Sequence, residues 1–144
     1  MGTAVWRVSG EVIEREELLD GRCQVVLDGE ADSNADADAE GVAFAVSLVW
    51  LLGREGEVPL AEGYVTVAAA AAELNASLDA GNVETSDETG AAAVRARFVV
   101  DAAEGDLDGF PQLRGDPASG ARVTCDIEVG TESWSGELRL EPPG

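Results

Sequence analysis

The sequence contains no histidine and no lysine, and all nine of its basic residues are arginine. Without histidine the chain lacks the usual general base at neutral pH, which excludes Ser-His-Asp and Cys-His catalysis and any histidine-ligated metal site. Without lysine it can form neither a Schiff base nor a P-loop phosphate contact. Paired carboxylates of the glycosidase type stay open, because acidic residues occur throughout the chain. We expect a protein that is not an enzyme.

Positive charge is scarce as well. Nine arginines stand against 29 acidic residues, which gives a net charge of −20. Such a charge opposes binding to phosphate backbones and to anionic membrane surfaces. The longest apolar stretch, residues 42–52, is too short to span a bilayer. The charge and the short apolar stretch thus predict no nucleic-acid partner and no membrane span. No basic region precedes an apolar segment at the N-terminus, so we also predict no signal peptide and a cytoplasmic or virion-associated protein.

The acidic composition predicts a high-salt environment. Hydrophobic residues make up 45% of the 144 residues, which is enough for a folded core despite the charge. At molar salt the Debye length is about 3 Å, so a surface this acidic barely repels itself. A GC-rich genome is the alternative source of arginine in place of lysine, but it does not explain 29 carboxylates. We therefore expect a halophilic organism or its virus.

Apolar and polar residues alternate with a period of two along most of the chain, which is typical of half-buried β-strands. Three acidic or Gly/Pro-rich loops, at residues 28–41, 80–90 and 103–120, punctuate the pattern. The sequence thus predicts one all-β domain over residues 1–144, mostly antiparallel, folded as a β-sandwich or small barrel with at most one short helix. About seven strands are expected, at residues 4–12, 22–27, 43–52, 64–67, 94–101, 122–129 and 134–140.

Several local features carry sharper expectations. Residues 43–52 have apolar residues on both faces, which predicts a central strand that is covered on both sides. Gly10 interrupts the inner face of the first strand and predicts a bulge there. Residues 68–79 fit an amphipathic helix and an alternating strand equally well. One tryptophan lies on the inward face of each of three strands, which favours core packing over a sugar-stacking platform for Trp6, Trp50 and Trp134.

The acidic loop contains a spacing found in calcium loops. Acidic or amide side chains alternate with other residues, and alternate oxygens can converge on a hard cation. The match to an EF-hand fails because Ala37 and Ala43 replace the turning glycine and the terminal glutamate. The alternative is a solvated acidic loop, which we favour, so no cofactor is expected and calcium is the one candidate. The possible cation ligands are Asp32, Asn34, Asp36, Asp38 and Glu40.

Two pairs of side chains remain. Arg95 and Arg97 share one face of a strand, where they could dock a carboxylate patch of a partner or form ion pairs within the sheet. Cys23 and Cys125 both face inward and could form a disulfide between neighbouring strands or stay as buried thiols. In the absence of an export signal we favour thiols, and two cysteines without histidine do not predict a zinc site.

Taken with the depleted catalytic residues, this compact β unit predicts a non-enzymatic structural or assembly protein of the shell, tube or virion type. It would act through protein–protein contacts, as a homo-oligomer or in a larger assembly. The alternative is a cation- or carbohydrate-binding β module.

Overall fold

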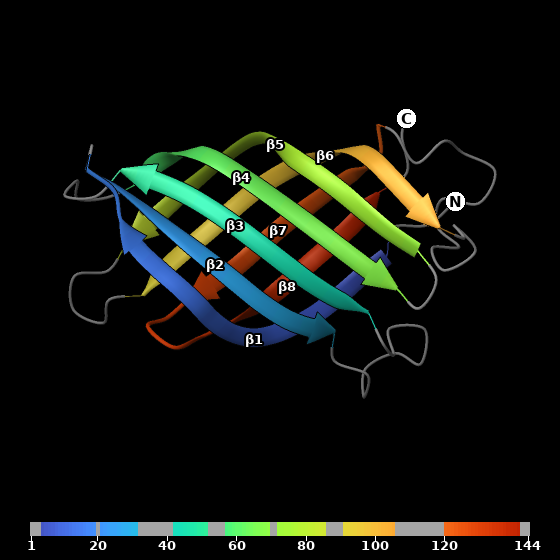
Figure 1. Ribbon diagram of the computed structural model, residues 1–144, viewed down its shortest axis with the longest axis horizontal. Helices are drawn as coiled ribbons and strands as arrows, with labels where there is room; N and C mark the ends of the chain where they lie inside the picture. Colours follow the sequence, from blue (N-terminus) through green and yellow to red (C-terminus); the bar gives the residue numbers. More distant parts are fainter. Residues whose placement is uncertain are drawn as a thin grey trace.

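The computed structural model of the protein is a closed barrel of eight antiparallel strands in which each strand pairs with the next along the chain (Figure 1). It describes residues 4–19, 21–31, 42–51, 57–69, 72–85, 91–105 and 120–141. The strands are β1 (Ala4–Glu17), β2 (Arg22–Ala31), β3 (Ala43–Leu51), β4 (Glu57–Ala69), β5 (Ala72–Thr85), β6 (Ala92–Gly105), β7 (Arg122–Val129) and β8 (Ser133–Glu141).

Pairing between β1 and β8 closes the barrel. It runs from Ala4 opposite Leu140 to Glu11 opposite Ser133. This closure removes every sheet edge and makes the molecule a barrel rather than a sandwich. The all-β, antiparallel prediction is confirmed, and the described residues contain no helix. It follows that no helix in this part of the chain is long and apolar enough to cross a membrane.

The ambiguous segment forms a strand, which raises the predicted seven strands to eight. β5 begins at Ala72 and pairs with β4 on one side and with β6 on the other. Alanine favours a helix by a few tenths of a kcal/mol per residue, but here two neighbouring strands supply the backbone partners. Strand structure also extends into the three predicted loops, since β2 reaches Ala31, β5 reaches Thr85 and β6 reaches Gly105.

Apolar side chains from all eight strands fill the barrel. Eight strands leave an interior just wide enough for side chains to occupy. Phe44, Val46, Leu48 and Trp50 of β3 are each at most 2% exposed, which confirms the predicted core face. The rings of Trp6 and Phe44 lie 5.6 Å apart. Among the described residues no polar or charged side chain is buried.

Two glycines let β1 and β2 approach closely, where a bulge was expected. Gly10 pairs directly with Gly29, and the bulge lies further along β1 at Ile13. A Cβ on Gly10 would lie 1.9 Å from the Asp28 carbonyl oxygen, and a Cβ on Gly29 would lie 2.6 Å from the Trp134 ring. The prediction of a bulge at Gly10 was therefore wrong: the missing side chains make room for a close backbone crossing and for the indole of Trp134.

Candidate protein interface

The outward residues of β3 and several outward positions on the neighbouring strands carry no charge, in a protein that has 26% charged residues. The outward residues of β3 are Ala43, Ala45, Ser47, Val49 and Leu51. Cross-strand pairing places Val26 of β2 and Tyr64 of β4 on either side of Ser47, and Ser77 of β5 beyond Tyr64. In the next row, Ala45 is paired with Thr66 of β4, and Thr66 is paired with Asn75 of β5. We call these ten outward residues of β2–β5 the neutral wall.

No other layer of the described chain covers the neutral wall. Tyr64 is 61% exposed and Leu51 is 39% exposed, whereas Val49 is buried although it lies outside the apolar cluster that fills the barrel. Within the described residues, Ala45 and Leu51 on the outer face of β3 are exposed although Val49 is buried, so the prediction of a strand covered on both faces was wrong for the outer face. The sequence of β3 resembles that of a doubly buried strand, and the structure leaves one of its faces to solvent.

Five of the ten residues of the neutral wall are polar, and none of the five is charged. The Thr66 hydroxyl donates a hydrogen bond of 2.9 Å to the Asn75 side-chain oxygen. Charged residues border the neutral wall closely. Asp28 and Arg22 of β2 are paired with Ala45 and Leu51, and Glu62 of β4 is paired with Val49. On β5, Glu73 is paired with Ala68 of β4. An uncharged centre that contains an exposed tyrosine and is bordered by charged residues is the usual anatomy of a protein–protein interface.

The opposite wall, over β6, β7 and β8, has the contrary character. It lies behind β3 and β4 in Figure 1. Its outward positions carry both arginines and carboxylates, among them Arg122, Asp126, Glu128, Glu137 and Arg139. The two walls therefore differ in charge, so a substitution on the charged wall can serve as the control for the same substitution on the neutral wall.

Arg95 and Arg97 lie together on this charged wall, where they line a depression of about 470 Å³ between β5 and β7. The Arg97 Nε donates to the Asp79 carboxylate at 2.9 Å, and Arg95 lies 3.9 Å from the carboxylate of Asp126. Asp79 is the extra residue of a bulge in β5. Both arginines thus face carboxylates of their own sheet, as the ion-pair interpretation expects, and such exposed pairs contribute little to stability.

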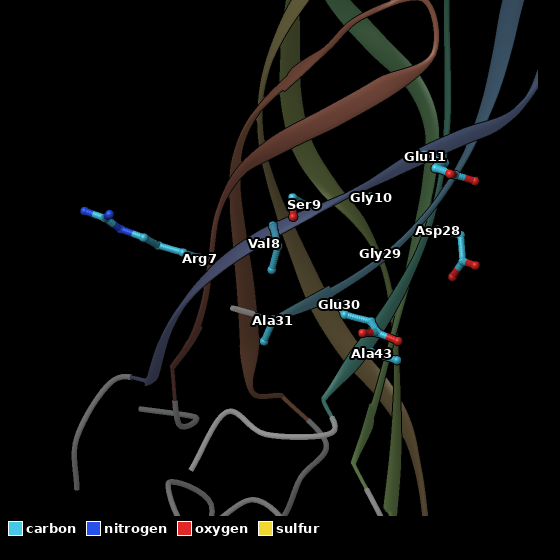
Figure 2. Close-up of a pocket in the computed structure, with 10 residues that line it drawn as sticks. All are labelled: Arg7, Val8, Ser9, Gly10, Glu11, Asp28, Gly29, Glu30, Ala31 and Ala43. Carbon is cyan, nitrogen blue, oxygen red and sulfur yellow. The ribbon is translucent and has the colours of Figure 1, made fainter. Parts of the chain in front are cut away.

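A second depression, of about 650 Å³, lies over β1 and β2. Figure 2 shows the carboxylates of Glu11, Asp28 and Glu30 along it, with the Arg7 side chain extended away from them. Within the described residues no three Asp, Glu or Cys side chains are grouped so that they could hold a metal ion. The predicted cation ligands Asp32, Asn34, Asp36, Asp38 and Glu40 lie outside the described residues.

In the described part of the chain, acidic residues face one another directly across neighbouring strands at four places. Each place brings two exposed or half-buried carboxylates opposite each other, and like charges in that position destabilise a sheet. Their number follows from the 29 acidic residues, which exceed the arginines available to separate them. The four pairs are Glu11 and Asp28, Glu57 and Glu84, Glu73 and Glu104, and Asp126 and Glu137.

The two cysteines are free and buried, as the thiol interpretation expects. They lie on β2 and β7, which are not neighbours in the barrel. Burial, with a smaller contribution from the nearby Asp126 carboxylate, raises the pKa of Cys125 to about 12. Burial also raises the pKa of the Cys23 thiol, against the opposing effect of Arg15. A high thiol pKa leaves little thiolate, so neither residue is suited to be a nucleophile.

Trp6, Trp50 and Trp134 all point into the barrel and are at most 6% exposed, which confirms the prediction of core packing. In the part of the chain that the structure describes, no tryptophan is exposed to stack against a sugar.

Comparison with known proteins gives no match to a protein-family model, to a curated protein or to a solved structure.

Proposed function

We propose that this protein is a non-enzymatic structural or assembly component of a high-salt organism or its virus, and that it acts through protein contacts made by the outer wall of the barrel. The observation that carries the proposal is the neutral wall. The outer face of β3 carries no charged residue and is partly exposed, in a chain with net charge −20. Exposed uncharged patches with charged margins are typical of interaction surfaces.

The filled interior supports the same proposal. Ligand-binding barrels of eight strands hold their ligand inside the barrel, whereas apolar side chains occupy the interior of this one. The four opposed carboxylate pairs support the high-salt part of the proposal, because salt screens the repulsion between them.

The proposal is tested by measuring how fast the full chain sediments at 2 M KCl in an extract of the cells that produce it. We expect the chain to sediment faster than a free monomer. Ser47→Glu, on the neutral wall, should return it to the position of the monomer. Ser135→Glu is the matched control, because it adds the same charge at an exposed serine of β8 on the opposite wall. Sedimentation of the unaltered chain as a monomer would contradict the proposal.

A further inference from the structure

We infer that the neutral wall binds the neutral wall of a second copy of this chain, so that two barrels pack with their β3 strands facing each other. This inference rests on the proposed function and names the partner. It follows from the charge of the wall, from its chemistry and from its size.

Charge argues against a basic partner on this wall. A surface with many arginines or lysines would be drawn to the carboxylates that cover the rest of the barrel, since the summed field of −20 charges steers positive groups toward them. An acidic partner would meet one arginine at the border of the wall, Arg22 opposite Leu51, and would be repelled by the neighbouring carboxylates of Asp28 and Glu62. The partner that matches is another uncharged surface.

The chemistry of the wall is complementary to itself. A two-fold dimer uses the same patch twice, so each polar group near the axis meets a copy of itself. Serine, threonine and tyrosine hydroxyls and the asparagine amide each both donate and accept hydrogen bonds, and can therefore pair with an identical group. Carboxylates cannot do so without a proton. Ser47 lies between Val26 and Tyr64 in the central row of the wall, which makes it the natural residue near the axis.

The size of the wall predicts a reversible dimer. A strand of nine residues, as β3 is, extends for about 30 Å. Four strands about 4.8 Å apart add a width of about 14 Å, and only in the row of Ser47 are the outward residues of all four strands uncharged. This flat area is below the roughly 800 Å² of accessible surface that each partner buries in a standard interface. We therefore expect an equilibrium between monomer and dimer.

Salt should favour this dimer. The carboxylates at the margin, Asp28, Glu62 and Glu73, approach those of the second copy when the walls meet. At 0.1 M salt the Debye length is about 10 Å and this repulsion is felt, whereas at 1 M it is about 3 Å and the margins are screened. Salts that are excluded from protein surfaces also strengthen apolar burial. A contact held by ion pairs would show the opposite dependence on salt.

Sedimentation velocity of the purified protein alone, from 0.3 to 3 M KCl, tests this inference. We expect the mass to rise from monomer toward dimer as KCl increases. Ser47→Glu should weaken the association at least tenfold because it places two like charges near the axis, and Tyr64→Ala should weaken it by removing exposed aromatic surface. Ser135→Glu should leave it unchanged. Circular dichroism spectra at each salt concentration establish that the variants are folded.

Cross-linking locates the contact. Ser47→Cys should form a covalent dimer with a short bis-maleimide at 3 M KCl, while Ser135→Cys, on the opposite wall, should not. The native cysteines are buried and should not react with the reagent. A purified protein that stays monomeric at every salt concentration would overturn the inference that the partner is a second copy of this chain. If the chain still sedimented rapidly in the cell extract, and Ser47→Glu abolished that, the proposed function would stand with a different partner. A dimer that Ser47→Glu leaves intact would overturn the neutral wall as its interface.

Discussion

The indole nitrogens of two buried tryptophans meet different surroundings. The Trp134 Nε1 donates a hydrogen bond of 3.0 Å to the backbone oxygen of Asp28, whereas the buried Trp50 Nε1 has no hydrogen-bond partner among the described residues. A buried N–H without a partner loses its bonds to water and gains nothing in return. The two tryptophans therefore differ in whether the indole N–H is hydrogen-bonded.

Trp50→Phe and Trp134→Phe should differ in cost for this reason. Both remove part of a buried ring, but only Trp134→Phe removes a hydrogen bond, so it should lower the free energy of unfolding by about 1 kcal/mol more. Urea unfolding at 2 M KCl measures both variants against the unaltered chain. Equal losses, or a larger loss for Trp50→Phe, would contradict the assignment of these hydrogen bonds.

Cys125 should make stability fall at high pH. Its folded pKa is raised to about 12 from an ordinary value of 9.0, so the unfolded chain releases this thiol proton at a lower pH than the native barrel does. The stability contributed by the buried thiol is therefore complete below pH 9 and is lost as the pH rises toward 12.

Urea unfolding at pH 8 and pH 10.5 tests this for the unaltered chain and for Cys125→Ala. We expect the variant to be less stable at pH 8 but to lose less stability between the two pH values. Other titrating groups are common to both proteins and cancel in the comparison. The same loss in both would mean that the Cys125 pKa is not raised.

The crossing of β1 and β2 depends on two glycines at the scale of the strand. Gly10→Ala would place a methyl group 1.9 Å from the Asp28 oxygen and 2.5 Å from the Gly29 Cα, which only a separation of the two backbones can relieve. Overpacking of this kind typically costs about 1–3 kcal/mol. Ser9→Ala, at the adjacent exposed position, is the control and should stay within about 0.5 kcal/mol. Thermal unfolding at 2 M KCl measures both, and a Gly10→Ala protein as stable as the control would contradict the close crossing.

Strand periodicity explains which parts of each element the sequence could predict. Alternation placed Trp6, Val25 and Leu138 inward because a strand turns successive side chains to opposite faces whatever it pairs with. It could not locate the extra residues of the bulges at Ile13 and Ala61, since these depend on how two neighbouring strands are matched. Nor could it separate helix from strand at residues 68–79, where local preference and the pairing of β5 point in different directions.

Salt should decide the stability of the whole barrel. No charged side chain in the described residues is buried, so the acidic charge lies on the outside, where ions screen it. Lowering the salt from 1 M to 0.1 M lengthens the Debye length from about 3 Å to about 10 Å, and the opposed carboxylate pairs then repel more strongly.

Thermal unfolding from 3 M down to 0.1 M KCl should accordingly show a steep fall in the midpoint. Glu73→Gln breaks the opposition of Glu73 and Glu104, so it should flatten the low-salt end of the curve while changing little at 3 M. Ser135→Gln, which removes no charge, serves as the control. A midpoint independent of salt would contradict the high-salt assignment.

The sequence by itself determined the strand class, the inward tryptophans and the acidic surface, because alternation and composition are local properties of the chain. Only the tertiary structure decided between sandwich and barrel, since closure depends on Ala4 of β1 meeting Leu140 of β8 across almost the whole chain. It also decided the candidate interface. Residues 43–52 predicted a strand buried on both faces. The structure shows that the barrel interior covers one face of β3 and that Ala45 and Leu51 on the other face are exposed, because a closed sheet has a single interior.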